Sequence, residues 1–172
     1  MVRYADPGAV EWVESSGGPL VMVPAGALPS WLGSDSDEQE TDYDRACEVD
    51  GWVGLIAVGS EVALVLGGEP ASTAFLPGPG LFVRWCAGES EAEFLESIGP
   101  ALDAAAWEPE IYWDLSGAVL LFDPVWSGRE LAGQDQARVD LESGRYAVSW
   151  AYVEPDPLTS SVLVRMRRLP QR

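Results

Sequence analysis

The chain has 172 residues, of which 47% are hydrophobic and 22% charged, and these proportions are typical of one globular domain rather than of a disordered chain. Its 28 acidic residues against 10 basic ones give a formal charge of -18, so we expect neither nucleic acid nor an anionic membrane as a partner. The chain has no histidine and no lysine, which excludes imidazole-based triads, imidazole metal ligands and lysine Schiff bases. We therefore expect a protein without catalytic activity, cofactor or metal.

The N-terminal part of the chain predicts a leader, one strand and a polar acidic segment. Residues 1–12 lack the basic segment and apolar run of a secretion signal, and no stretch reaches the run of about 18 apolar residues of a membrane helix, which predicts a cytoplasmic location. Residues 16–23 (SGGPLVMV) predict a buried strand that opens at a Gly-Gly-Pro turn. From Ser34 the sequence SDSDEQETDYD has no hydrophobic period, which predicts a solvated loop. Thr41 and Asp44 fit a capping box that starts a short helix.

The next part of the chain predicts antiparallel strands. Residues 51–58 and 61–66 are apolar runs separated by Gly59-Ser60, which predicts a hairpin with a two-residue turn. Residues 72–76 and 81–87 predict two further strands, and the sequence Pro-Gly-Pro-Gly between them predicts a turn.

A helix is predicted after these strands. Ser90 and Glu93 fit the capping-box pattern, and the apolar residues that follow share one helix face. We expect Gly99-Pro100 to interrupt this helix and a second one, 100–106, to follow at an angle, since proline is tolerated in a first helical turn.

The second half of the chain echoes the first at an offset of 100 residues. Residues 12–24 read WVESSGGPLVMVP and residues 112–124 read YWDLSGAVLLFDP, so an aromatic residue, an acid, a Ser-Gly pair, a leucine and a proline coincide. We interpret this as a degenerate duplication of a β-rich unit, and coincidence between similar strands is the alternative. The duplication predicts pseudo-repeat halves 10–88 and 110–170, joined by a helical segment 90–106.

Three more strands, 139–141, 145–153 and 161–166, complete a prediction of about nine strands. We expect a single domain over residues 1–172, of the α+β class and mainly antiparallel β, with one or two short helices.

The acidic stretch 35–44 has three possible roles. Its alternate carboxylates resemble a calcium loop, but counting from Asp35 places Glu40 where an EF-hand needs glycine, and Ala46 where it needs the bidentate glutamate. A plain solvated loop and an acidic contact surface for a basic protein remain.

Two of the eight tryptophans are candidates for exposure. Trp31 and Trp126 follow prolines in predicted loops, and tryptophan is a preferred interface anchor. The candidate partner-binding residues are therefore Trp31, Asp35, Asp37, Glu38, Glu40, Asp42, Asp44 and Trp126.

Two other functions are compatible with the composition. Carboxylate pairs such as Glu14 and Asp114 are the groups that a small carboxylate-dependent hydrolase uses when they converge in a cleft. A ligand-binding β domain without catalytic activity would instead have a closed apolar pocket.

Several segments together are similar to a known family. The segments WVESSGGPLVMVPAGALPSWLG, TDYDRACEVDGWVGLIAVG, ALVLGGEPASTAFLP and LFVRW resemble the Imm21 group of bacterial immunity proteins, which are encoded beside polymorphic toxins. The resemblance covers residues 10–90 well and the segments IYWDLSGAVLLFD and SGRYAV more loosely. It implies a non-catalytic inhibitor that binds a cognate toxin domain and protects the producing cell or its kin, and it brings no set of binding residues.

Overall fold

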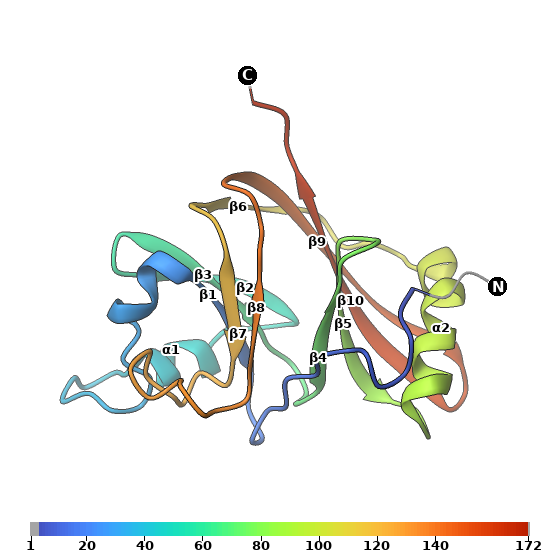
Figure 1. Cartoon of the computed structure of the whole chain (residues 1–172), viewed down its shortest axis with the longest axis horizontal. Coiled ribbons are helices and arrows are strands. Elements are labelled where there is room, and N and C mark those ends of the chain that lie inside the picture. The colour runs from blue at the N-terminus through green and yellow to red at the C-terminus, as the bar shows by residue number, and fades with distance from the viewer. Residues whose placement is uncertain (1–3, 172) are drawn as a thin grey trace.

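The fold is built from ten strands, two α-helices and one 3₁₀ helix within residues 4–171, the part of the chain that the computed structural model describes (Figure 1). The helices are η1 (Ala25–Ser30), α1 (Asp42–Cys47) and α2 (Glu91–Ala104). The strands are β1 (Leu20–Pro24), β2 (Val53–Val58), β3 (Glu61–Leu66), β4 (Ser72–Leu76), β5 (Leu81–Ala87), β6 (Ile111–Leu115), β7 (Val119–Phe122), β8 (Gln136–Val139), β9 (Gly144–Asp156) and β10 (Thr159–Arg168).

These strands form two five-stranded sheets whose pairs are all antiparallel. The strand order is β2-β3-β1-β7-β8 in the first sheet and β4-β5-β10-β9-β6 in the second. The prediction of an α+β fold that is mainly antiparallel β is therefore confirmed. Within residues 4–171, no helix has the length and apolar character needed to cross a membrane.

The two sheets enclose the main hydrophobic core. Leu20 and Met22 of β1 point into it together with Leu64 and Leu66 of β3, and Phe82 of β5 lies opposite. Val21 and Val23 point to the other face of the first sheet, which is also buried. Because β1 is covered on both faces, its sequence is an unbroken apolar run rather than an alternating one.

Helices and loops cover the two outer faces. Phe94 and Ile98 of α2 pack on the outer face of the second sheet against Leu163 of β10. The outer face of the first sheet is covered by η1, by α1 and by the segment between β7 and β8, which contributes Leu131. In Figure 1, α1 and α2 accordingly lie at opposite ends of the molecule.

The hairpin of β2 and β3 is confirmed. Val58 pairs with Glu61 across the Gly59-Ser60 turn, and Gly59 has a φ of 56°, a conformation that favours glycine.

The prediction of two helices around Pro100 is wrong, because α2 is one helix that contains Pro100. Packing of its apolar face on the second sheet stabilises the helix across the proline. The strand predicted at 139–141 instead ends at Val139. The strands predicted at 145–153 and 161–166 extend further towards each other than expected, because Asp156 at the end of β9 already pairs with Thr159 at the start of β10.

The C-terminal parts of the two echoed segments, β1 and β7, lie side by side in the first sheet. β1 pairs with β7, with Val21 opposite Phe122 and Met22 opposite Leu121. The duplication itself stays a prediction.

Candidate partner-binding surface

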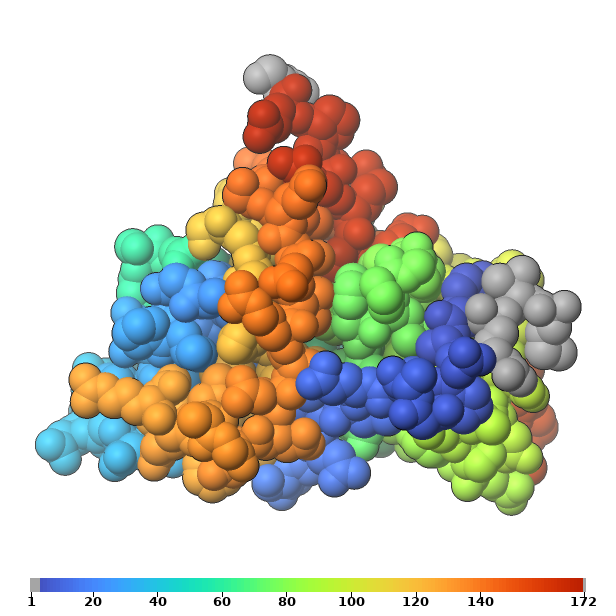
Figure 2. Space-filling model, viewed as in Figure 1, coloured from blue at the N-terminus to red at the C-terminus, as the bar shows by residue number. Residues whose placement is uncertain are grey.

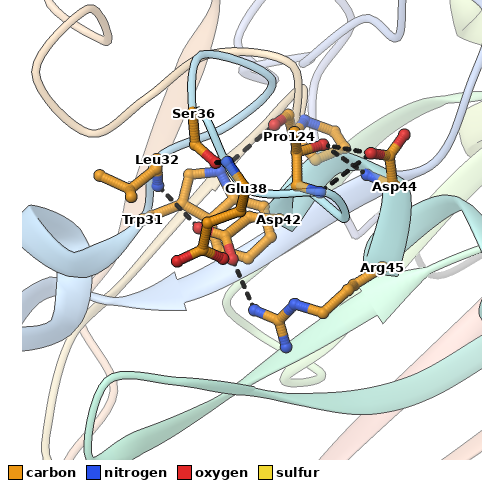
Figure 3. A network of polar contacts seen from close by, with 9 residues as sticks. Trp31, Leu32, Ser36, Glu38, Asp42, Asp44, Arg45 and Pro124 are labelled. Carbon is orange, nitrogen blue, oxygen red and sulfur yellow. Dashed lines mark hydrogen bonds and ion pairs between the residues drawn. The ribbon is translucent and has the colours of Figure 1, made fainter.

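The acidic segment 34–41 is closed at its base by Asp42. One carboxylate oxygen of Asp42 accepts a hydrogen bond from the backbone N–H of Leu32 at 2.7 Å. The other oxygen lies 2.6 Å from the Arg45 guanidinium, one helical turn further on. Figure 3 shows both contacts beside the ring of Trp31. Asp42 therefore holds together the two ends of the segment.

The far end of the segment is fixed by the predicted capping box. The Thr41 hydroxyl accepts a hydrogen bond from the Asp44 N–H at 3.1 Å, and the Asp44 carboxylate accepts one from the Thr41 N–H at 2.9 Å. The Asp44 carboxylate thus accepts hydrogen bonds from the Thr41 backbone N–H and also from the Thr41 hydroxyl at 2.8 Å. These two bonds, the backbone one first, lower the pKa of the Asp44 carboxyl, since both favour its charged form. Thr41 and Asp44 thus cap the N-terminus of α1 together, and the Asp44 carboxylate is committed to this cap.

The near end of the segment docks on the loop that follows β7. The Ser34 N–H donates to the Val125 carbonyl at 3.1 Å, and the Gly128 N–H donates to the Trp31 carbonyl at 2.9 Å. Gly33 has a φ of 62°, and a Cβ at this position would lie 2.5 Å from the Val125 carbonyl oxygen. Only glycine allows this close approach of the two backbones.

The remaining acidic side chains of the segment are exposed and form no ion pair within residues 4–171. They are Asp35, Asp37, Glu38 and Glu40. The segment projects from the end of the molecule that carries α1, as the light-blue atoms at the lower left of Figure 2 show. It is a fixed, exposed loop of negative charge.

Carboxylates at this end of the molecule also repel each other. A hydrogen bond with Glu40, and then the negative charge of Glu40, raise the pKa of Glu48. Glu48 follows directly after α1. A cation placed beside this pair would relieve the repulsion.

Arginines at the C-terminal end of β10 are paired with carboxylates. Arg167 lies 2.9 Å from Glu110, and Arg168 lies 2.9 Å from Glu142. The positive charges of Arg167 and Arg168 are thereby locally balanced, whereas the negative charge of the acidic segment is not.

Residues 11–159 match the family model described as immunity protein 21, Imm21. The chain belongs to this family. No curated protein and no solved structure shows significant similarity to it. The match includes the whole acidic segment and all strands before β10, which begins at the last matched residue.

Trp31 of this Imm21 chain does not contact solvent, so the expectation of exposure was wrong. Its side chain is 1% exposed, its Nε1–H donates to the Pro124 carbonyl at 3.3 Å, and its ring packs edge-on against Phe122. The reason is that η1 turns Trp31 back onto the outer face of the first sheet. Its neighbour Leu32, which the sequence did not single out, is 41% exposed instead.

Trp126 is half-buried in the same Imm21 structure. It packs on the cluster that contains Trp31, and it lines a shallow depression beside Glu14, Asp123 and Asp135. Asp123 is itself engaged, because its carboxylate accepts the N–H of Ser16 at 2.8 Å.

The carboxylates considered for a hydrolase belong to different regions of the Imm21 fold. Glu14 precedes β1, and Asp114 lies on β6 just before β7, 4.0 Å from Arg145. Because β1 and β7 are antiparallel neighbours, the residues that precede them lie at opposite ends of the sheet. Within residues 4–171, no three histidine, cysteine or acidic side chains form a group that could hold a metal ion.

Proposed function

We propose that this Imm21 protein binds a cognate toxin domain, encoded beside its own gene, and blocks it by burying the toxin's active site or substrate groove in a one-to-one complex. Membership in an immunity protein family supports this role. The absence of histidine and lysine supports an inhibitor that performs no reaction.

The observation that carries the proposed contact is the acidic segment. Its exposed carboxylates have no basic partner within residues 4–171, and their backbone is anchored at Leu32, Asp42 and Ser34. An anchored loop loses little conformational entropy on binding. Unbalanced negative charge accelerates encounter with a positively charged groove, such as one that binds a polyanionic substrate. We therefore assign the steering role to Asp35, Asp37, Glu38 and Glu40.

Apolar side chains at the base of the segment supply the anchor that charge alone does not provide. Leu32 is 41% exposed and lines a depression with Ser34 and the acidic residues that follow. Trp126 lies half-buried in the neighbouring loop. Trp31 supports this surface from beneath, since it is packed under the segment. Asp42 and Asp44 shape the surface through their backbone contacts.

The experiment is calorimetry and stopped-flow association with the neighbouring toxin domain, at low and at high salt. We expect one-to-one binding with loss of toxin activity. The variant D35S/D37S/E38S/E40S removes the free carboxylates and leaves Asp42 and Asp44 in place. We expect its association at low salt to be about tenfold slower, and the difference to disappear at high salt.

A matched control removes the same charge elsewhere. Glu11, Glu89, Asp103 and Glu108 are exposed and lie outside the acidic segment, so the variant E11S/E89S/D103S/E108S changes the net charge equally. We expect it to associate almost like the wild type. Equal slowing in both variants would reject the acidic segment as the steering surface, and no binding by the wild type would reject the toxin partner.

A further inference from the structure

One of the four sheet edges within residues 4–171 lacks the usual protection. Edge strands offer unpaired backbone groups, and proteins commonly cover or charge them. β4 is covered by Val13, which exchanges two hydrogen bonds with Thr73 at 2.8 and 2.9 Å. β8 carries Arg138 and β6 carries Asp114, both of which are charged and exposed. β2 has the sequence VGLIAV, with no charge, no proline and no bulge.

The register of the hairpin shows which backbone groups of β2 are free. The Gly67 N–H donates to the Trp52 carbonyl at 3.0 Å, so this pair is a hydrogen-bonded one. Bonded and non-bonded pairs alternate in an antiparallel ladder. The residues of β2 that bond to β3 are therefore Gly54, Ile56 and Val58, and the last of these closes the two-residue turn.

The N–H and C=O groups of Val53, Leu55 and Ala57 consequently point away from β3. No partner for them is found within residues 4–171. Leu55 is 36% exposed and Ala57 is exposed as well, so the outer half of this edge is open to another chain. The outward N–H and C=O groups of Leu55 and Ala57 are of the kind that a short additional strand pairs with.

We propose that β2 is a docking strand to which an extended segment of the toxin adds, so that the toxin continues the first sheet beyond β2. This inference rests on the proposed function and names where the toxin's main chain binds. Affinity would come from main-chain hydrogen bonds to Leu55 and Ala57, and from apolar contact with the Leu55 side chain.

Charge decides in favour of a basic toxin segment over a second copy of this chain. Asp50 is exposed just before β2. Glu48 is exposed just after α1. The helix α1 packs beside β2, because Ala46 of α1 and Val58 of β2 belong to the same buried cluster. An incoming strand with arginine or lysine beside its apolar residues would meet these carboxylates. Two copies would each bring a charge of -18 to the same edge, which opposes pairing.

The test is hydrogen exchange with and without the neighbouring toxin domain. In the free protein we expect the amides of Leu55 and Ala57 to exchange faster than those of Gly54 and Ile56. In the complex we expect their exchange to slow at least tenfold.

A proline variant tests the same contact by affinity. Ala57→Pro removes an outward N–H and leaves the bonds to β3 in place, so we expect a thermal midpoint close to that of the wild type and an affinity for the toxin at least about tenfold lower. Leu55→Lys, which blunts the edge with charge, should weaken binding as well. Leu158→Lys is the control, because Leu158 is 65% exposed at the tip of the β9–β10 turn, and it should bind normally.

The outcomes separate the two proposals. Tight binding without slower exchange at Leu55 and Ala57, and with wild-type affinity of Ala57→Pro, would overturn the docking strand and leave the immunity function intact. Absence of binding by the wild type would overturn both. A concentration-dependent dimer of the free protein that slows these amides would identify a second copy as the occupant and overturn the toxin segment.

Discussion

The backbone N–H of Leu32 donates a 2.7 Å hydrogen bond to the carboxylate of Asp42, and this contact closes the acidic segment into a loop. The carboxylate is 15% exposed and also binds Arg45. Asp42, which the sequence places among exposed acidic residues, thus has a structural role. Its replacement should loosen the loop in addition to removing one negative charge.

Replacing Asp42 should loosen the acidic segment. Asp42→Ala removes the bonds to Leu32 and Arg45, so we expect residues 33–41 to exchange their amides faster and the free energy of unfolding to fall by about 1–2 kcal/mol. Hydrogen exchange and denaturant unfolding measure the two effects. Asp37→Ala removes the same charge from an exposed side chain and should change neither quantity. Equal exchange in the two variants would contradict the role of Asp42.

Replacing Trp31 should cost stability. Its side chain is 1% exposed and packs against Phe122, so Trp31→Ala should lower the free energy of unfolding by about 3–5 kcal/mol through the cavity it leaves. Trp31→Phe should lose less, because the ring fills most of the space. Thermal unfolding gives the comparison. A Trp31→Ala protein of wild-type stability that no longer binds the toxin would show that the side chain acts at the interface.

Gly33 should not tolerate a side chain. Its φ is 62° and a Cβ would come within 2.5 Å of the Val125 carbonyl oxygen, so Gly33→Ala must separate the acidic segment from the loop after β7. We expect a fall in stability of more than about 1 kcal/mol and loss of the bond between Ser34 and Val125, seen by hydrogen exchange. Gly78→Ala is the control, because nothing lies within 4 Å of a Cβ there. Similar effects in both variants would refute the close approach.

The cap of α1 should make stability depend on pH. Hydrogen bonds from Thr41 lower the pKa of Asp44 in the folded state. The folded state therefore binds this proton less readily than the unfolded state, and the cap's contribution is present above the ordinary aspartate pKa and is lost as the pH falls through the folded pKa. Asp44→Asn should flatten this part of the stability profile. NMR titration of Asp44 checks the direction, and an ordinary or raised pKa would contradict it.

The elements that were predicted correctly depend on neighbouring residues. The capping box of α1 and the Gly59-Ser60 turn are set by two to four consecutive residues, so their sequence patterns are sufficient. The acidic segment was found in the same way, because its polarity is local.

What could not be predicted depends on residues far apart in the chain. Trp31 is buried because Phe122 and Pro124 reach it from the other half of the sequence. The exposure of Leu32 follows from that burial, since adjacent side chains point in different directions. The free edge of β2 likewise depends on the order of the whole sheet. No pattern within a short window contains this information.

The position of β10 has a consequence for how the protein is made. This last strand lies in the middle of the second sheet, between β5 and β9, and Leu81 pairs with Arg165. During synthesis, β4 and β5 therefore emerge long before the strand that pairs with them, and the second sheet closes only after the C-terminal residues have left the ribosome. A chain without β10 would lack the strand that pairs with both β5 and β9, so the two parts of the second sheet, β4-β5 and β9-β6, could not join.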